Sequence, residues 1–417
     1  MQKQKVLLLS LVLGFMACEK EFSPLSGHYT GNENFSTKQS DHFAAAVDEQ
    51  YVAAHSKFAL AIFKQLSESS AGNIFISPLS LSIALEMTYN GAQEQTKEEM
   101  AGALQIDGFT LDEVNQNALS LQKSLTKCDQ DIELELCNSI WINQSLEVKA
   151  DYVERIQRHF LARVDQLDFA SSQSKEMIND WVNEKTRGKI PELVESLDCS
   201  AMLLINAVVF KGAWSAEFDP QKTETSAFFL PDGRQTAAEF MTNGSANYSF
   251  LLGESFKAVR LPFGRDKIAM YLFMPDAAIS LATFIQCCDP TDLENWFSEF
   301  SPMDKNSKEF KLQIPKFRIA FDITFNESLK KLGMENAFTG SANFLDISEQ
   351  PIWIDSVRQK AFIEIDEQGC EAAAATVVDM TWSAPASLKF DRPFLFFIRD
   401  DRSGTLLFMG KVIDPSI

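Results

Sequence analysis

Residues 364–387 read EIDEQGCEAAAATVVDMTWSAPAS. A strand-like start gives way to Gly369, then to four consecutive alanines (372–375), and then to the β-formers of 376–378. Taken alone, the alanine run favours a short surface helix, because alanine is the best helix former. The flanking sequence has to decide between that interpretation and an extended, exposed loop.

The rest of the chain changes character from helix to strand along its length. Apolar residues at helical spacing cover 42–66, Ser77 and Pro78 form a helix start, and Thr-x-x-Glu boxes at Thr96 and Thr110 predict two further helices. Later stretches alternate with period two and predict strands at 132–136, 140–142, 268–274, 310–321, 362–365, 394–398 and 406–409. No fixed repeat or linker interrupts 43–417, so we expect one domain of the α+β class with large sheets.

The composition suits a large core and argues against polyanionic partners. Of the 417 residues, 45% are hydrophobic and 11% are aromatic, including 34 phenylalanines. The formal net charge is −20, and no basic stretch offsets it. A polyanion of this size repels nucleic acid, so we expect no nucleic-acid partner.

Catalytic motifs are missing from the sequence. There are four histidines (28, 42, 55 and 159), none of them in an H-E-x-x-H motif, and there is no G-x-S-x-G, Walker or G-x-G-x-x-G pattern. Acid pairs such as Glu98-Glu99 fit a solvated surface better than a general acid–base couple. We therefore expect no enzyme, no cofactor and no metal site.

The cysteine spacing indicates neither a disulfide framework nor a metal site. All seven lie outside C-x-x-C pairs and outside metal-ligand spacing with histidine: Cys18, Cys128, Cys137, Cys199, Cys287, Cys288 and Cys370. A domain of this size does not need disulfides, so most are expected to be small buried hydrophobic residues.

The N-terminus is typical of an export signal. Lys3 and Lys5 precede an apolar run, 6–17, that is too short to span a bilayer. The run ends in Ala17-Cys18, which resembles a bacterial lipobox with Phe15 where leucine is usual. Cleavage by ordinary signal peptidase and a buried N-terminal helix are the alternatives. The prediction is a signal peptide (1–17), a lipidated Cys18, a flexible tether (18–42) and a domain (43–417).

Several motifs, in order along 43–417, decide the meaning of the alanine run. They are NIFISPLS (73–80), WVNEKTRGKIPEL (181–193), LINAVVFKGAW (204–214), LQIPKFRIAF (312–321) and the stretch 394–415 with its FMGK. Together with DEQGCE before the alanines, this ordered set resembles the serpins, and in particular their inhibitory members.

The resemblance implies a fold and a mechanism. The fold would have a large mixed central sheet of five strands, further sheets, about nine helices and an exposed reactive loop at about 367–389. A target serine endopeptidase, or alternatively a cysteine endopeptidase, would cleave the loop and form an acyl-enzyme. The freed hinge would then insert as an extra strand and trap the protease.

The hinge residues suit such an insertion. They are Glu367, Gly369, Cys370, Glu371, Ala372, Ala373, Ala374, Ala375 and Thr376. An inserted strand alternates faces, so Cys370, Ala372, Ala374 and Thr376 would enter the core while Glu371 faces outward. No proline interrupts this segment, so every N–H can join the sheet. Cys370 replaces the usual threonine or serine and is expected to be a free thiol.

Other positions carry over from the family one by one. Ser77, Ser80 and Asn206 match the shutter that controls sheet opening, and Gln359 stands where the shutter usually has histidine. Trp214 matches the tryptophan at the breach, where the loop enters; a plain core tryptophan is the alternative. Residues 110–127 hold only two lysines, Lys123 and Lys127, so no activation by heparin is expected.

The reactive bond is predicted at Trp382-Ser383. At the spacing usual in the family, counting forward from Glu367 gives the bond Ser383-Ala384, whereas counting back from Phe390 gives Trp382-Ser383. We prefer the second count because it leaves the rigid Pro385 further from the bond. Trp382 and Met380 point to chymotrypsin-like or subtilisin-like targets, and the small residues leave elastase-like targets open. We expect a monomer held at a bacterial outer membrane or cell surface through Cys18, or else a periplasmic or secreted protein. A non-inhibitory carrier serpin and a binding lipoprotein of another fold are the rival functions.

Overall fold

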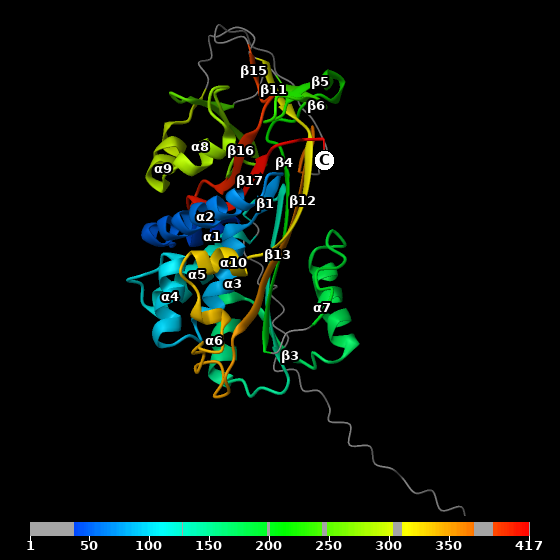
Figure 1. Cartoon of the computed structure of the whole chain (residues 1–417). Coiled ribbons are helices and arrows are strands. Elements are labelled where there is room, and N and C mark those ends of the chain that lie inside the picture. Colours follow the sequence, from blue (N-terminus) through cyan, green and yellow to red (C-terminus); the bar gives the residue numbers. More distant parts are fainter. Residues whose placement is uncertain are drawn as a thin grey trace, which may run out of the picture.

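The computed structural model describes residues 37–126, 128–197, 201–243, 248–302, 311–370 and 387–416 (Figure 1). These ranges contain ten α-helices, against the expected nine or so, and strands in three sheets, which confirms the α+β class. The α-helices are α1 (Thr37–Ala44), α2 (Glu49–Ser69), α3 (Pro78–Tyr89), α4 (Glu94–Leu104), α5 (Leu111–Leu125), α6 (Ala150–Phe160), α7 (Ser172–Lys185), α8 (Leu281–Cys287), α9 (Pro290–Glu299) and α10 (Asn326–Lys331). Two 3₁₀ helices are η1 (Pro220–Lys222) and η2 (Asn336–Phe338).

The central sheet has five strands along its path and one short addition. In spatial order they are β12 (Phe317–Thr324), β13 (Ile354–Ile365), β4 (Met202–Ala213), β2 (Ile132–Asn143) and β3 (Arg163–Leu167). The pairs β13–β4 and β2–β3 are parallel, and β12–β13 and β2–β4 are antiparallel. The two-residue strand β14 (Gly369–Cys370) pairs with the upper end of β4. The mixed five-stranded sheet expected from the resemblance is therefore present.

Two further sheets complete the fold. The seven-stranded sheet has the order β1 (Ile74–Ile76), β17 (Thr405–Val412), β16 (Phe394–Asp400), β9 (Ile268–Pro275), β8 (Phe256–Phe263), β7 (Ser249–Leu252) and β10 (Ser301–Pro302). The four-stranded sheet has the order β15 (Ser387–Lys389), β11 (Lys311–Pro315), β6 (Gln235–Asn243) and β5 (Glu224–Phe229). Because β15 follows the reactive loop, this small sheet holds the loop's C-terminal end.

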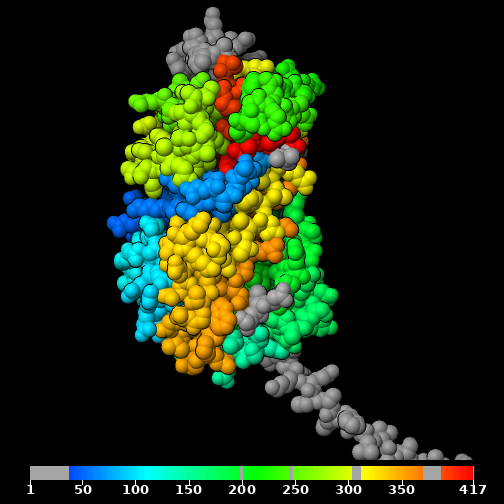
Figure 2. Space-filling view, in the orientation of Figure 1, coloured from blue at the N-terminus to red at the C-terminus, as the bar shows by residue number. Residues whose placement is uncertain are grey.

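Two cores lie on opposite faces of the central sheet. The larger one packs α2–α6 and the seven-stranded sheet against alternate residues of β4, among them Leu204, Val208 and Phe210. The smaller one packs α7 against the residues between them, Leu203, Ile205 and Ala207. Figure 1 shows α7 alone on its side of the sheet. In Figure 2 the N-terminal helices (blue) cross the middle of the opposite side, between α8–α9 and α4.

The structure differs from the sequence-based prediction at the start of the domain. Residues 37–42, predicted as the end of a tether, belong to α1, whose Ser40 and Ala44 are buried. The helix predicted at 42–66 is interrupted before α2, because the carboxylate of Asp48 accepts hydrogen bonds from Gln50 N (2.7 Å) and Tyr51 N (3.2 Å) and starts a new helix.

The two predicted capping boxes have different outcomes. Thr110 and Glu113 form the expected reciprocal box at the start of α5. Thr96 lies inside α4 instead, and its buried hydroxyl accepts a hydrogen bond from Asn343 N at 2.9 Å. Its predicted partner Glu99 accepts from the backbone N–H groups of η2. The box prediction at Thr96 was wrong because both side chains are recruited by a segment distant in sequence.

Candidate functional site

The described start of the hinge is a tight turn that leads from β13 into β14. Asp366 and Gly369 exchange backbone hydrogen bonds, Asp366 N to Gly369 O at 3.1 Å and Gly369 N to Asp366 O at 3.3 Å. The Asp366 carboxylate also accepts from Gln368 N at 2.9 Å. The turn directs the chain back along β4, where Gly369 lies opposite Ala213 and Cys370 opposite Gly212.

Gly369 is required by this turn for two reasons. Its φ of +124° is one that other residues rarely adopt. A Cβ at this position would lie 2.3 Å from Gly212 O and 2.7 Å from Trp214 N. The close approach of two backbones at the top of β4 therefore depends on glycine.

Trp214 holds the hinge turn from below. Its indole Nε1 donates to Asp366 O at 3.0 Å, and its backbone N donates to Gln368 O at 3.0 Å. The ring is buried and stacks on Phe263 at 4.4 Å between centroids. Trp214 is thus both a core residue and a hydrogen-bond donor to the turn between β13 and β14.

Glu367 anchors the same turn through its side chain. Thr223 Oγ1 donates to one carboxylate oxygen at 2.6 Å, and Lys316 Nζ lies 3.2 Å from the other. Burial by itself would raise the pKa of Glu367, but the hydrogen bonds from Thr223 and Lys316 outweigh it and lower the pKa. The carboxylate therefore stays ionised and fixed at the point where β13 ends.

Sequence reasoning missed both partners of Glu367. Lys316 lies within the LQIPKFRIAF motif, so its position was noted without its charge being used. Thr223 lies just before β5, outside every motif quoted, and no sequence signal indicated it. A third contact, Phe218 N to Glu367 O at 2.8 Å, is a backbone bond and cannot be read from residue types.

The seam between β13 and β4 is closed at the bottom and unpaired at the top. Paired residues run from Ile354 opposite Met202 to Ala361 opposite Val208. Above Ala361, β13 continues to Ile365 with pairing to β12 alone, and a narrow cleft opens that is lined by Phe362, Val209, Phe210 and the segment after α7. Cys370 and Gly369 occupy the upper end of this seam. A strand could be added there without breaking pairs at the entrance.

Gln359 lies at the centre of the shutter. Its side chain is 1% exposed. The amide oxygen accepts from Ser77 N at 2.8 Å, and the amide nitrogen donates to Ser77 O at 3.0 Å and Asn206 Oδ1 at 2.7 Å. Because Gln359 is on β13 and Asn206 on β4, this one side chain bridges the seam and ties it to α3.

The other shutter residues complete the network. Asn206 Nδ2 donates to Ser80 O at 3.0 Å and also contacts the side chains of Ser80 and Asn138. Ser77 Oγ donates to Leu407 O at 2.8 Å, which connects the shutter to β17. Asn138 Nδ2 is buried and has no hydrogen-bond partner among the residues that the structure describes. Asn138 was not predicted, although its place on β2 beside Asn206 follows from the sheet register.

The C-terminal end of the reactive loop is held by β15. Ser387, Leu388 and Lys389 pair in parallel with β11. Lys389 Nζ donates to Ser226 Oγ at 2.6 Å and lies 4.3 Å from the centre of the Phe240 ring. The loop is therefore fixed at both ends, one at the breach and one on the small sheet (Figure 1).

Several predicted positions lie outside the described residues. They are Cys18, Cys199, the hinge residues Glu371, Ala372, Ala373, Ala374, Ala375 and Thr376, and the reactive-bond candidates Met380, Trp382, Ser383 and Ala384. Four cysteines within the described ranges, Cys128, Cys137, Cys287 and Cys288, are free thiols. Over the same ranges, no helix combines the length and apolarity needed to cross a membrane, and no cluster of metal-ligating side chains occurs.

Comparison with known proteins places this architecture in a family. The family model "Serpin (serine protease inhibitor)" matches residues 53–415. An uncharacterized serpin-like protein of Methanosarcina acetivorans is 32% identical over 395 residues, covering 88% of each chain. The leukocyte elastase inhibitor of Sus scrofa is 31% identical over 379 residues, covering 88% of this chain and all of the relative.

Solved structures agree with the sequence comparison. The crystal structure of tengpin, a thermophilic serpin in its native state, matches with a TM-score of 0.80 and 28% identity over 88% of this chain and 95% of tengpin. Thyroxine-binding globulin in complex with thyroxine has the same fold, with a TM-score of 0.78 at 24% identity over 88% of this chain and 99% of that one. With its mixed central sheet, breach and shutter, and with a family match over most of its length, the chain belongs to the serpin family.

Proposed function

We propose that this serpin is a suicide-type inhibitor of serine endopeptidases, and not itself an enzyme. The observation that carries the proposal is β14, which already pairs with the top of β4 at the mouth of an unpaired seam. A protease would cleave the reactive loop, become attached as an acyl-enzyme, and be carried along the sheet as the hinge inserts. Cysteine endopeptidases are possible further targets, since they form acyl-enzymes in the same way.

The register of β14 specifies the whole inserted strand. Gly369 lies opposite Ala213 and Cys370 opposite Gly212. Continued without a bulge, this antiparallel register puts Thr376 opposite Asn206 and Met380 opposite Met202, the first residue of β4. The inserted strand would then fill the seam from top to bottom and displace the shutter contact of Gln359. Trp382 would arrive at the far end of the sheet.

The same register assigns the faces of the inserted strand. Even-numbered residues of β4, such as Val208 and Phe210, face the larger core, and residues opposite one another share a face. Ala372 and Ala374 would therefore enter that core, beside Phe210 and Val208. Glu371 would lie opposite Lys211 on the other face, where opposite charges across a strand pair are favourable. The alanine side chains would thus lie on the face of the strand that packs against the larger core.

Cleavage would be needed for complete insertion because the intact loop is too short. A strand from Cys370 to Met380 is about 33 Å long. Residues 381–386 would then have to return to Ser387 at the top of the molecule, yet fully extended they reach only about 25 Å. An uncleaved loop could insert only in part unless β15 left its sheet. The protein would therefore stay in its uninserted state until a protease cleaves the loop.

Incubation with a panel of proteases tests this function. We expect chymotrypsin-like, subtilisin-like or elastase-like enzymes to form SDS-resistant complexes in 1:1 ratio, with trypsin giving none. The elastase-like class has support from the similarity to leukocyte elastase inhibitor. Cleavage of the loop by every protease without a covalent complex would reject inhibition and favour a non-inhibitory carrier serpin.

The reactive bond is proposed at Trp382-Ser383. Mass spectrometry of the C-terminal fragment released from a trapped complex should give a peptide that begins at Ser383. A fragment that begins at Ala384 would select the alternative bond, Ser383-Ala384. One that begins upstream of Thr381 would contradict both.

We further propose that the protein is exported as a monomer and anchored to an outer membrane or cell surface through lipid on Cys18. Multiple acyl chains would give stable attachment, whereas a single chain would not. Expression of the full chain in a bacterium followed by fractionation tests this. Wild type should carry lipid and partition with membranes, and Cys18→Ala should not. Equal partitioning without lipid would favour a periplasmic or secreted protein.

A further inference from the structure

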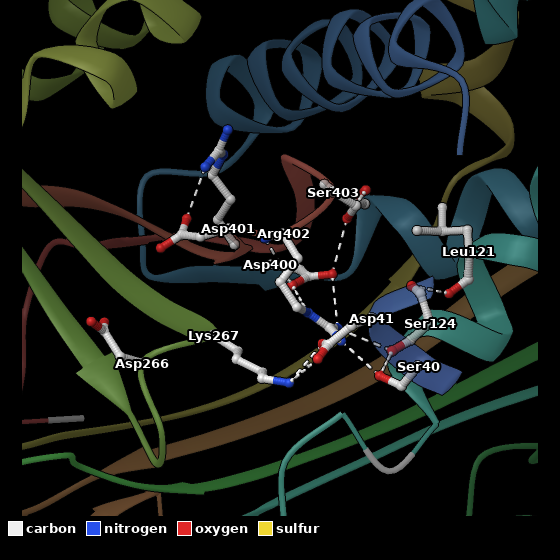
Figure 3. Close-up of polar contacts among 12 residues, drawn as sticks. Ser40, Asp41, Leu121, Ser124, Asp266, Lys267, Asp400, Asp401, Arg402 and Ser403 are labelled. Carbon is white, nitrogen blue, oxygen red and sulfur yellow. Dashed lines mark hydrogen bonds and ion pairs between the residues drawn. The ribbon is translucent and has the colours of Figure 1, made fainter. Parts of the chain in front are cut away.

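Helix α1 lies before the residues that match the family, which begin at 53, and it is fixed by an extensive polar cluster (Figure 3). We define this α1 clamp as Ser40, Asp41, Ser124, Lys267, Asp400, Arg402 and Ser403. Its members come from α1, the end of α5, the β8–β9 turn and the β16–β17 turn. Four segments distant in sequence therefore meet around one guanidinium group.

Arg402 is the centre of the α1 clamp. Its Nη1 donates to Ser40 Oγ at 2.6 Å and to Asp41 Oδ1 at 3.1 Å. Its Nη2 donates to Ser124 O at 3.0 Å and to Asp400 Oδ2 at 3.1 Å, and its Nε donates to Asp400 Oδ1 at 2.8 Å. All three guanidinium nitrogens are used, and three of these five bonds go to α1 or to the α5 residue Ser124.

The α1 side of the clamp is equally well bonded. Lys267 Nζ donates to both carboxylate oxygens of Asp41, at 2.6 and 2.8 Å. Ser40 is fully buried, and its hydroxyl donates to Ser124 O at 2.7 Å. Burial would raise the pKa of Asp41, but the bonds from Lys267 and Arg402 outweigh it and lower the pKa. Hydrogen bonds to charged groups with this geometry are among the stronger ones in proteins.

The clamp shapes the turn that starts β17. Asp400 is 0% exposed and depends on Arg402 as its counter-charge. It also accepts from Ser403 Oγ at 3.0 Å, while Gly404 N donates to Asp400 O at 2.8 Å with φ of +80° at the glycine. Without α1, Arg402 would lose two partners and become exposed to water. The buried carboxylate would then hold its turn less firmly.

Strand β17 connects this turn to the shutter. It starts at Thr405, whose hydroxyl lies within hydrogen-bond distance of Ser403 Oγ, at 2.9 Å. Two residues further on, Leu407 O accepts the hydroxyl of Ser77, and the backbone of Ser77 is bonded to Gln359 across the seam. The contacts are thus continuous from α1 to the residue that keeps β13 and β4 together.

We infer that docked α1 stabilises the closed central sheet through the β16–β17 turn and Ser77, so that undocking α1 shortens the lifetime of the uninserted state. The effect on protease trapping rests on the proposed function, whereas the effect on the shutter does not. Such coupling needs an element with two arrangements whose equilibrium is shifted both by α1 and by the shutter. We assign this role to the β16–β17 turn with the start of β17.

The test compares the full-length double variant Ser40→Ala/Asp41→Asn with wild type by hydrogen exchange. The variant removes the α1 side of the clamp and leaves Arg402 and Asp400 in place. Glu98→Gln, an exposed carboxylate on α4, is the control with the same change of charge. We expect exchange at least tenfold faster in 37–44 and about threefold to tenfold faster in peptides that contain Ser77, with the control like wild type.

Protease trapping gives the second readout. The half-life of trapping-competent protein during storage at 37 °C should fall several-fold in the double variant, and to a smaller extent in Arg402→Lys, which keeps the charge but loses the planar fork. Faster exchange in 37–44 with unchanged exchange at Ser77 would overturn the inference. If exchange at Ser77 responds but wild type traps no protease, the proposed function fails and the coupling stands.

Discussion

The seven-stranded sheet and the β13–β4 seam are both buried, yet they are held together in different ways. In the sheet, β16 pairs with β17 and β9 over nearly its whole length, and aromatic rings such as Phe273, Phe397 and Phe297 pack edge to face. In the seam, pairing stops at Ala361 and the main side-chain link is the amide of Gln359. Separating packed aromatic rings would leave cavities, whereas an amide that loses one hydrogen-bond partner can bond to another. We therefore expect the seven-stranded sheet to be a permanent region and the seam to be the region that opens during the proposed insertion.

The largest expected effect is on the inserted strand itself. Ala374→Arg would place a charge opposite Val208 in the larger core, and burial of an unpaired charge costs several kcal/mol. Since about 1.4 kcal/mol slows a step tenfold, insertion should slow by at least about 100-fold, and the protein should be cleaved as a substrate. Gel analysis with chymotrypsin measures the ratio of complex to cleaved serpin. Stoichiometric complexes formed by this variant would contradict both the register and the mechanism.

A substitution in the permanent region should act on stability alone. Phe273→Ala removes a fully buried ring from the seven-stranded sheet and should lower the free energy of unfolding by about 3–5 kcal/mol. Below its unfolding temperature, the variant should still divide protease between complex and cleavage as wild type does. Denaturant titration and the gel assay together make the measurement. A large shift toward cleavage would mean that the two regions are not separate.

Loss of the Glu367 contacts should have a smaller effect than Ala374→Arg and in the opposite direction, because it should promote premature insertion. Glu367→Lys sets a like charge beside Lys316 and removes the acceptor of Thr223. We expect the trapping-competent form to be lost about tenfold faster on storage, because repulsion of about 1–2 kcal/mol releases the turn above the seam. Lys316→Glu combined with Glu367→Lys restores opposite charges and should recover much of the lifetime. If the double variant is no better than the single one, the ion pair is not what holds the turn.

These tests concern features that sequence could locate only in part. The mixed sheet could be predicted from the family motifs, which also contain Trp214 and three of the predicted shutter positions, Ser77, Ser80 and Asn206. The partners of Glu367 could not, since Thr223 and Lys316 are brought to it by tertiary folding. The same reason explains why the capping box predicted at Thr96 is absent and why residues 37–42 were predicted as a tether although they belong to α1. In that helix, Ser40 is buried and Asp41 is ion-paired by partners up to 362 residues away in the chain.

The replacement of histidine by Gln359 predicts the behaviour of the seam with pH. Glutamine does not titrate, so the shutter contact should be constant between pH 5 and 8. Gln359→His should make the rate of sheet opening change several-fold over that range, since a charged imidazole would have to be buried. The protection of Ser77 N, measured as exchange relative to the intrinsic rate at each pH, gives the measurement. An equal pH dependence in wild type would place the titrating group elsewhere.

Acid should release the hinge through Glu367, with the smallest effect of the series. Its pKa is lowered in the folded protein, so its contribution to stability is complete above the unfolded pKa of about 4.5 and is lost as the pH falls through the lower, folded value. The protection of Trp214 N, measured as exchange relative to the intrinsic rate at each pH, should therefore fall a few-fold upon acidification in that window. Glu367→Gln should flatten this response. A flat wild-type profile would show that Thr223 and Lys316 do not favour the charged form.

The pairing of Gly369 and Cys370 with β4 also sets a time scale. Starting a new strand is ordinarily the slow event, because a chain must be brought to the sheet edge before the first bond rewards it. Here two residues are already paired, so the proposed insertion needs elongation of β14 and separation of the β13–β4 pairs up to Ala361. Hairpins zip within about 1–10 μs, far faster than most enzymes complete a turnover. Under the proposed function, the pairing of these two residues would favour insertion over hydrolysis of the acyl-enzyme.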